Sequence, residues 1–249
     1  MQGVGFITTP FLSRIRQENM ELSKRLLRLT RMVTKGKKVA DIGCDHAYVS
    51  IYLMKEKIAS HVIAMDVNKG PLERAKANIR GYHLTDNIEV RLSDGAKELR
   101  PGEVDSILIA GMGGALMKRI LSDSLPVVKE LSELILQPQS ELFVVRKYLH
   151  EIGFVIDQED MLIEDGKYYT MLHAIKGEEK YSNDAEYIYG KQLLYHQNPV
   201  AKEFLLKEKR VKETIYQALQ MGAVTTEKRK EELVNELNII KEGLSYYDR

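Results

Sequence analysis

Residues 39–53 read Val-Ala-Asp-Ile-Gly-Cys-Asp-His-Ala-Tyr-Val-Ser-Ile-Tyr-Leu. An apolar run ends in the carboxylate of Asp41, a turn follows with Gly43 and the small Ala47, and an amphipathic segment begins at Tyr48. This order predicts a strand, a tight loop and a helix. Glycine lets a chain approach a ligand closely, and the start of a helix offers free N–H groups. The stretch therefore predicts a nucleotide-binding unit around which the fold is organised.

The loop of this unit departs from the dinucleotide fingerprint G-x-G-x-x-G. Asp45 and Ala47 stand where small glycines would be needed to cradle a pyrophosphate. Carboxylates at Asp41 and Asp45 instead favour a ligand that carries positive charge. We therefore take Asp41, Gly43 and Asp45 as candidate cofactor-binding residues.

Apolar runs and amphipathic segments alternate up to about residue 176, which is typical of an α/β fold with a mostly parallel sheet. Strands are expected at residues 60–67, 87–92, 104–110 and 132–137, and helices at 11–33, 71–82, 140–152 and from 116 onward. Residues 153–163 and 168–175 predict a terminal hairpin, because Asp165 and Gly166 between them favour a tight turn.

Acidic and glycine residues follow several of these predicted strands. Asp66 ends the second, where a carboxylate can accept hydrogen bonds from both ribose hydroxyls of a nucleotide. Alternatively Asp66 caps the next helix, a role for which Asn68 is also suited. Asp94 and Gly95 follow the third strand, and the fourth ends in a Gly-Met-Gly-Gly loop that begins at Gly111 and leaves room for a ligand or base. These ends are where ligands of open α/β sheets bind.

The composition limits the possible classes of protein. With 249 residues, 44% of them hydrophobic, the chain can bury one full core and carry a smaller appendage. A net charge of +1 gives no whole-chain attraction to nucleic acid or membranes. The single cysteine, Cys44, excludes an intramolecular disulfide and suits a reducing compartment. No apolar stretch approaches about 18 residues and residues 1–10 lack the features of a signal peptide, so we expect a cytoplasmic protein without a membrane segment.

The pattern beyond Lys176 is purely helical. Asn183 with Glu186 resembles a capping box, and Asn198 precedes a proline at a first helical position. The last segment has an apolar seam typical of a coiled coil. The seam consists of Leu233, Leu237, Ile240, Leu244 and Tyr247. We expect two long helices joined near residues 221–225, with Gly222 ending the first.

These motifs together closely resemble the TrmK family of bacterial tRNA (adenine-22-N1)-methyltransferases, class I enzymes that use S-adenosylmethionine (SAM). The resemblance rests on the Asp41 to Tyr48 loop, on Asp66 and Asp94, on Ala-Gly-Met-Gly-Gly at 110–114 and on Ile-Leu-Gln-Pro-Gln at 135–139. The usual class I loop is Asp/Glu-x-Gly-x-Gly-x-Gly. This chain keeps its first two key positions and departs at the two later glycines.

The resemblance implies a Rossmann-like, seven-stranded α/β sheet, a C-terminal coiled-coil domain, SAM as cofactor, tRNA as partner and methyl transfer to N1 of an adenine. It also implies that Asp94 accepts a hydrogen bond from the adenine amino group of SAM. Family members tend to begin near residue 20. The expected division is therefore an N-terminal extension (1–19), a methyltransferase domain (20–177) and a helical hairpin domain (178–249).

The loop at 110–113 also bears on the chemistry. Methyltransferases acting on exocyclic amines usually carry Asn/Asp-Pro-Pro-Tyr here, whereas this chain has Ala-Gly-Met-Gly. Adenine N1 holds its lone pair in the ring plane, so it needs alignment more than deprotonation, and its Watson–Crick edge must be unpaired or flipped out. Asp45 and His46 are the candidate catalytic side chains. For His46, a loop histidine bonded to backbone is an equally weighted alternative.

Basic residues supply candidates for tRNA contact. Residues 14–38 hold nine Lys/Arg against two Glu, which predicts either phosphate contacts or a solvated helix face. The candidates are Arg25, Arg28 and Arg31 in this segment and Lys207, Lys209 and Arg210 in the C-terminal hairpin. We expect that hairpin to hold tRNA, and a chain truncated after Lys176 to stay folded and bind SAM.

Alternatives to this assignment remain at the level of sequence. An NAD-linked oxidoreductase would share Asp66, but it would not explain Asp94 or the absent fingerprint. A class I methyltransferase acting on another RNA base or on a small molecule would keep the same cofactor residues, and so would a non-catalytic SAM-binding protein. No metal site is expected, and a monomer is favoured.

Overall fold

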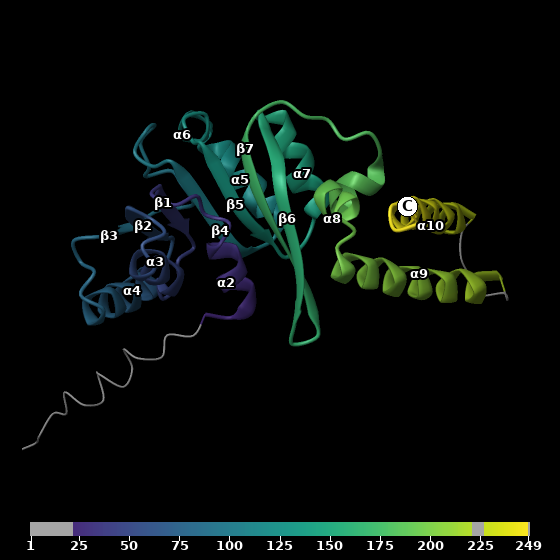
Figure 1. Ribbon diagram of the computed structural model, residues 1–249, viewed down its shortest axis with the longest axis horizontal. Coiled ribbons are helices and arrows are strands. Elements are labelled where there is room, and N and C mark those ends of the chain that lie inside the picture. Colours follow the sequence, from purple (N-terminus) through teal and green to yellow (C-terminus); the bar gives the residue numbers. More distant parts are fainter. Residues whose placement is uncertain (1–21, 221–226, 249) are drawn as a thin grey trace, which may run out of the picture.

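The computed structural model describes residues 22–220 and 227–248. Its centre is a seven-stranded sheet with the order β3-β2-β1-β4-β5-β7-β6 (Figure 1). The strands are β1 (Lys38–Ile42), β2 (His61–Asp66), β3 (Ile88–Leu92), β4 (Ser106–Met112), β5 (Glu133–Pro138), β6 (Phe154–Glu164) and β7 (Lys167–Lys176). The predicted Rossmann-like α/β sheet is thereby confirmed.

The sheet is parallel from β3 through β5, and β7 pairs antiparallel with both of its neighbours. Every residue of β5 is buried, as expected for a central strand covered on both faces. Between β6 and β7, Asp165 and Gly166 have φ angles of 50° and 73°. A two-residue turn that matches the twist of its strands needs such left-handed angles at both positions, so the predicted hairpin is confirmed.

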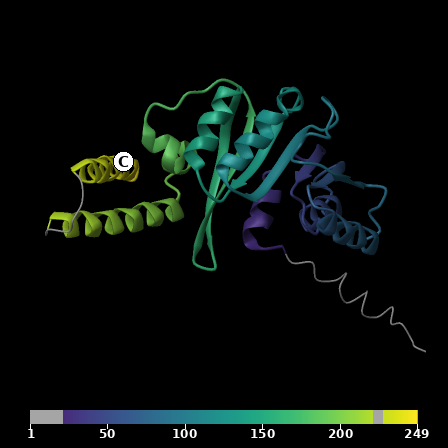
Figure 2. The ribbon, with the colours of Figure 1, turned by 180° about the vertical axis from the view of Figure 1, so that it is seen from behind.

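Helices cover both faces of the sheet (Figures 1 and 2). They are α2 (Lys24–Thr30), α3 (Tyr48–Lys55), α4 (Lys69–Gly81), α5 (Gly114–Asp123), α6 (Leu125–Val128) and α7 (Leu142–Glu151). One core cluster joins α2, α3 and α4 to the sheet through residues such as Leu29, Ile51 and Ile79. The other joins α5, α6 and α7 through residues such as Met117 and Leu149.

The start of two helices differs from what the sequence predicts, one in its position and the other in its capping. Residues 11–21 of the predicted 11–33 helix lie outside the described residues, and α2 covers only Lys24–Thr30, where the Ser23 hydroxyl accepts the N–H of Leu26 at 3.5 Å. At the start of α4, Asn68 holds the N-cap position without a side-chain capping bond. Its own N–H instead donates to Oδ1 of Asp66 at 2.9 Å.

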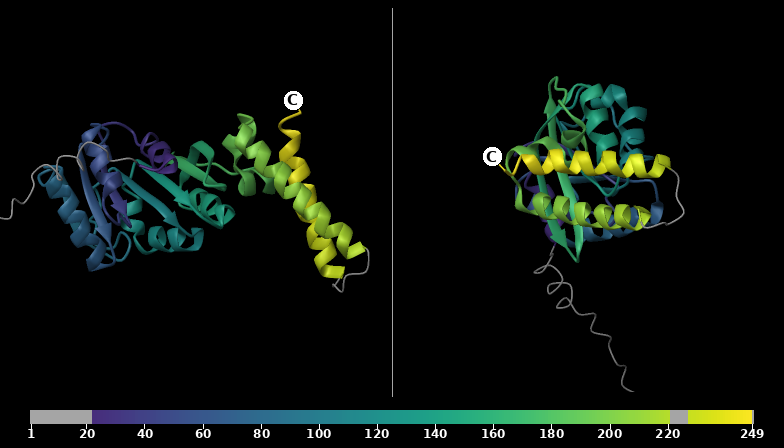
Figure 3. Two further views of the ribbon diagram at one scale, coloured as in Figure 1. Left: turned by 90° about the horizontal axis from the view of Figure 1, so that it is seen from below. Right: turned by 90° about the vertical axis from the view of Figure 1, so that its right-hand side faces the viewer.

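The C-terminal residues form the π-helix η1 (Glu186–Gly190) and the helices α8 (Lys191–Tyr195), α9 (Pro199–Gln220) and α10 (Glu227–Ser245). Helices α9 and α10 lie side by side and project from the sheet as a hairpin (Figure 3). Oδ1 of Asn198 accepts the N–H groups of Val200 and Ala201, so the predicted cap is confirmed. The seam residues Leu233 and Ile240 are fully buried. Residue 222 lies outside the described residues.

The predicted capping box forms in part. Oδ1 of Asn183 accepts the N–H of Glu186 at 2.9 Å, but the Glu186 carboxylate binds the N–H and hydroxyl of Ser182 and the hydroxyl of Tyr246. The turn that follows is a π-helix. Within the described residues, no helix combines the length and the apolar character needed to cross a membrane.

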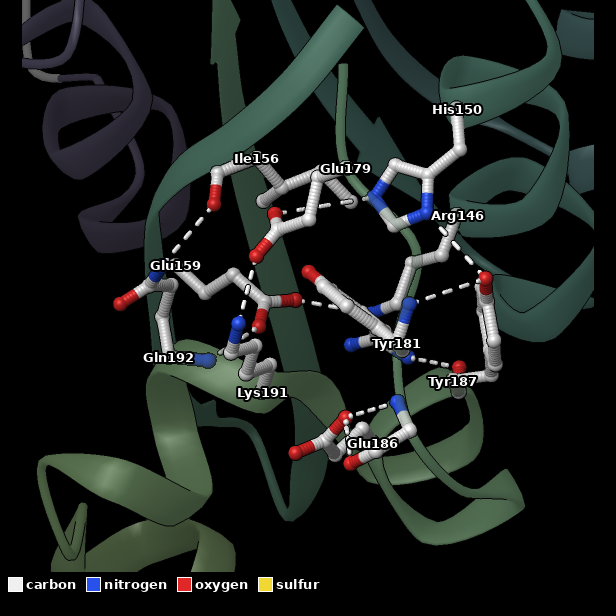
Figure 4. A network of polar contacts seen from close by, with 11 residues as sticks. Arg146, His150, Ile156, Glu159, Glu179, Tyr181, Glu186, Tyr187, Lys191 and Gln192 are labelled. Carbon is white, nitrogen blue, oxygen red and sulfur yellow. Dashed lines mark hydrogen bonds and ion pairs between the residues drawn. The ribbon is translucent and has the colours of Figure 1, made fainter.

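A buried polar network fastens these C-terminal helices to the sheet domain (Figure 4). Arg146 of α7 is 1% exposed, and its Nε donates to Glu159 of β6 at 2.8 Å. Its Nη1 donates to the carbonyls of Tyr187 and Ile188 in η1, each at 2.8 Å. The second carboxylate oxygen of Glu159 accepts the N–H of Gln192 at 3.1 Å. We call this set the junction network.

Apolar packing also fastens the C-terminal residues to the sheet domain. Tyr181 and Tyr187 belong to the core cluster of the sheet domain although they follow residue 177. Truncation after Lys176 would uncover that cluster and remove backbone partners of Arg146 and Glu159. The packing argues against the expectation that such a fragment stays folded, and the domain boundaries at 19 and 177 remain predictions.

Candidate active site

The loop after β1 lies at the carboxyl edge of the sheet. Gly43 has φ 76°, a left-handed angle that favours glycine, and a Cβ there would displace the end of the Met112 side chain. The N–H groups of Gly43 and Cys44 both donate to the carbonyl of Met65 at 2.8 and 2.9 Å, which ties the loop to the end of β2. Ala47, at φ 59°, precedes the first turn of α3. The backbone therefore holds the ends of β1 and β2 together, as the sequence predicts.

The carboxylates of this edge differ in exposure. Asp41 is 3% exposed and accepts the hydroxyl hydrogen of Ser50 at 2.6 Å, and its burial raises its pKa to about 6. Asp66 is half-buried, and its Oδ1 accepts the Asn68 N–H, which is part of the alternative helix-start role. Its Oδ2 has no hydrogen-bond partner within residues 22–220 and 227–248 and so remains available to a ligand.

Asp94 and Gly95 follow β3 at the same edge. Asp94 is exposed and forms an ion pair with Lys97 at 2.5 Å, and the hydrogen bond from Lys97 lowers the pKa of Asp94. The carbonyl of Gly95 accepts the hydroxyl of Ser93 at 2.8 Å. Asp94 is therefore ionised at neutral pH, but Lys97 would share it with any ligand.

Asp45 and His46 stand on the solvent side of the loop. The Asp45 side chain is 66% exposed, with His46 Nε2 at 3.6 Å and Arg74 Nη2 at 3.7 Å from its Oδ1. The carbonyl of His46 accepts the side-chain N–H of Asn78 at 2.9 Å, while its ring stacks on that of Tyr48 with centroids 5.7 Å apart. The backbone of His46 is thus held, and its ring faces the loop surface beside Tyr48.

Tyr48 is a candidate site residue that the sequence reasoning did not single out. It is 43% exposed at the start of α3, directly after the loop. Its position directly after the loop is the feature of the sequence that could have identified it. An exposed ring there offers a face on which a purine can stack.

The Gly111 loop brings in two further residues. Gly111 has φ 77° and donates its N–H to Oε1 of Gln137 at 3.2 Å. Nη1 of Arg25 donates to the same oxygen at 2.8 Å. Gln137 is fully buried; it belongs to the Ile-Leu-Gln-Pro-Gln motif, but the sequence reasoning gave it no role, although a glutamine after Leu-Ile-Leu in a central strand is itself a signal. Arg25 therefore lies against the active-site edge, apart from the other arginines of its helix.

The remaining basic candidates do not form one surface. Arg28 forms an ion pair with Asp160 at 2.8 Å, and Arg31 is exposed. On α9, Lys207 lies over the ring of Tyr168 and Lys209 pairs with Glu213 at 3.7 Å. Arg28 and Arg31 border a cavity of about 300 Å³ between α2, β6 and α8. Its lining is Arg28, Arg31, Met32, Asp157, Gln158, Glu159, Asp160, Gln192 and His196.

This cavity is separate from the carboxyl edge, since it contains none of the residues that follow β1, β2, β3 or β4. Its three carboxylates share the cavity with the cations Arg28 and Arg31, so it is less suited to a cationic cofactor than the edge that holds Asp41 and Asp66. The edge is therefore the candidate cofactor site on chemical grounds. Among the described residues, no group of three His, Cys, Asp or Glu side chains could hold a metal ion.

Comparisons with known proteins agree with this geometry. Residues 22–172 match a family model described as a methyltransferase domain. The chain is 32% identical over 234 residues to the tRNA (adenine(22)-N(1))-methyltransferase of Bacillus subtilis, covering 91% of this chain and 98% of that protein. A solved structure of the B. subtilis m1A22 tRNA methyltransferase TrmK superposes with a TM-score of 0.82 at 32% identity, over 91% of this chain and 100% of that one.

A second structure bears on the cofactor. A candidate tRNA (m1A22) methyltransferase from Streptococcus pneumoniae, solved in complex with S-adenosyl-L-methionine, has a TM-score of 0.81 at 32% identity. Another crystal structure of the same protein has a TM-score of 0.84 at 33% identity. It covers 90% of this chain and 100% of its own. The similarity to both proteins extends over about nine-tenths of this chain and over the whole of theirs. The chain therefore belongs to the TrmK family of class I methyltransferases.

Proposed function

We propose that this protein transfers the methyl group of SAM to N1 of an adenine in tRNA, at position 22 as in its named relatives. One observation carries the proposal: Asp41, Asp66 and Asp94 lie at or next to the carboxyl ends of three adjacent parallel strands, β1, β2 and β3. Relatives that match this chain over nine-tenths of its length support the choice of tRNA.

The chain's own residues divide the cofactor among them. Asp66 offers Oδ2 to the ribose hydroxyls, since Oδ1 is already bound by Asn68. The ionised carboxylate of Asp41 favours the positive charge of SAM. The carboxylate of Asp94 accepts a hydrogen bond from the adenine amino group of SAM while it keeps its ion pair with Lys97. Gly43, Gly95 and Gly111 keep the loops free of side chains at these points.

When bound, SAM supplies an electrophilic methyl group on a sulfonium. Adenine N1 attacks with its in-plane lone pair, a new C–N bond forms as the C–S bond breaks, and the adenine ring takes up the positive charge. No proton has to leave N1 first. The protein therefore acts mainly by alignment, which can contribute up to about 7–11 kcal/mol, and the Asp45 carboxylate is placed to stabilise the cationic product.

The target adenine must leave its stack before N1 can reach the methyl group. The exposed ring of Tyr48, which stacks beside the His46 ring directly after the Asp41–Ala47 loop, is a surface on which the flipped base can stack. The Gly111–Gly114 loop would border the base on its other side. Tyr48, Asp45 and His46 are thus proposed to contact the substrate.

The tRNA backbone needs positive charge farther from the reaction centre. Arg28 and Arg31 along α2 and Lys207, Lys209 and Arg210 along α9 are proposed phosphate contacts. Both helices contact β6, but the two groups are separate, so each would hold a different part of the tRNA backbone. The near balance of charge in residues 178–249 means that such contacts are local.

The test is incubation of the protein with labelled SAM and unmodified tRNA, followed by mapping of the modified base. We expect label on N1 of one adenine of tRNA. Label on small molecules alone, on another base, or SAM binding without any transfer would each contradict the proposal.

A further inference from the structure

A β-bulge shapes the end of β4. Ala110 pairs with Gln137 and Met112 pairs with Pro138, so the register of β4 on β5 skips Gly111. One common kind of bulge has a glycine with a left-handed angle, and Gly111 has φ 77°. The N–H of this extra residue donates to the side chain of Gln137 at 3.2 Å.

Arg25 holds the same oxygen. Its Nη1 lies 2.8 Å from Oε1 of Gln137, although the two residues are 112 positions apart. Its guanidinium carbon is 5.3 Å from the ring centre of Tyr169 on β7, which supports the planar group from one side. At its other end, Nε2 of Gln137 donates to the carbonyl of Pro138 at 3.2 Å. The amide of Gln137 is therefore fixed at both ends, with Arg25 and Gly111 sharing one acceptor.

Arg25 differs in this respect from Arg28, three residues along the same helix. Arg28 has a side chain that is 54% exposed and reaches a surface carboxylate, whereas Arg25 is half-buried and reaches a fully buried amide. A phosphate-binding arginine presents its donors to solvent. The contacts of Arg25 point instead to the loop against which the target base is aligned.

We propose that Arg25 is a positioning residue for methyl transfer, acting through Gln137 to fix the Gly111 bulge and so the shape of the Gly111–Gly114 loop. This rests on the function proposed above and deepens it. Without Arg25, the Gln137 amide loses its charge-assisted donor and the bulge loses its rigid anchor. A small displacement of the aligned groups lowers turnover on the order of ten- to a hundredfold, while groups that bind SAM and tRNA stay in place.

The experiment compares R25M, R25K, Q137M and the R25M/Q137M double variant with the wild type. The kcat and KM for tRNA are measured together with SAM affinity, thermal melting and the salt dependence of tRNA binding. K24M is the matched control, because Lys24 is exposed on the same helix and its side chain does not reach Gln137.

We expect R25M to lower kcat roughly ten- to a hundredfold, with the KM for tRNA, the SAM affinity and the salt slope within about twofold of wild type. R25K should recover part of kcat, since an ammonium can still donate to Gln137. The double variant should be no slower than the slower single variant, because both changes remove the same bond. K24M should keep the wild-type kcat.

A fall in tRNA affinity and salt slope with kcat retained would overturn the proposal and make Arg25 a phosphate contact. Additive losses in the double variant would also overturn it. If R25M does not fold, Q137M is judged by the same criteria, and a wild-type kcat in Q137M refutes the proposal. Absence of transfer to tRNA by the wild type would instead reject the proposed function, which separates the two failures.

Discussion

The carboxyl edge of the sheet and the junction network are both rich in charged groups, but they treat charge in opposite ways. At the edge, Asp45 is largely exposed and one oxygen of Asp66 has no partner among the described residues. At the junction, Arg146 and Glu159 are almost fully buried and are bonded to each other and to backbone. The edge keeps carboxylate oxygens that can accept hydrogen bonds from a ligand, whereas the charged groups of the junction bond to one another and to the backbone.

This difference follows from the cost of burying charge. An ionised group that leaves water must be paired and hydrogen-bonded, so the junction is stable only as a complete set. The edge remains hydrated and tolerates open bonding positions until a ligand fills them. Changes at the junction should therefore act on stability, and changes at the edge on binding. The following experiments test that division.

The largest effect is expected from truncation after Lys176. Removal of Tyr181 and Tyr187 uncovers part of the sheet core, and Arg146 loses its backbone acceptors in η1. We expect the fragment to lose the cooperative thermal transition of the full chain. A fragment with a wild-type melt that rises on adding SAM would show that the junction is dispensable.

The next effect is that of Arg146→Met. The substitution leaves Glu159 buried beside a neutral side chain, and burial already raises the pKa of Glu159. Breaking a buried pair in this way typically lowers the free energy of unfolding by about 3–5 kcal/mol. Denaturant melts measure it, with Arg28→Met as control, because the exposed pair of Arg28 with Asp160 contributes at most about 1 kcal/mol. Equal losses in both variants would contradict the contrast between the regions.

Asp66→Ala tests the edge. We expect SAM affinity to fall by about 1.5–3 kcal/mol for each charge-assisted bond to the ribose that is lost, with little change in the melting temperature of the free protein. Calorimetry measures the affinity, and Asp86→Ala, an exposed aspartate before β3, serves as control. Unchanged SAM affinity in the Asp66 variant would remove it from the cofactor site.

The smallest effect concerns the pH dependence of Asp41. Burial raises its pKa from 3.8 to about 6, so its contribution to the stability of the free protein is fully present below about pH 3.8 and is lost as the pH rises through about 6. The affinity for SAM changes with pH in the opposite direction and rises as the pH rises through about 6, because the cation favours the ionised carboxylate of Asp41. We expect affinity to weaken by up to about tenfold per pH unit below pH 6. Calorimetry on the wild type and on Asp41→Asn measures it; identical pH profiles would exclude Asp41 as the cause.

The sequence was sufficient to point to the candidate cofactor edge because its signals are local. Asp41, Gly43 and Asp66 each stand where a strand ends, and a parallel sheet brings those ends together whatever the distant packing. The hairpin turn at Asp165 and Gly166, the cap at Asn198 and the helical seam likewise depend on residues close in sequence. Patterns of this kind can be read from the chain alone.

Other features depended on contacts between distant residues. No local pattern distinguishes Arg25 from Arg28 or marks Arg146 and Glu159 as partners, because burial and pairing are properties of the packed molecule. The chain by itself therefore determined the order of strands and helices and the place of the carboxylates that await a cofactor. Only the tertiary structure decided which arginine reaches the Gly111 bulge and which lock the C-terminal helices to the sheet, since a charged side chain takes its role from what surrounds it once water is excluded.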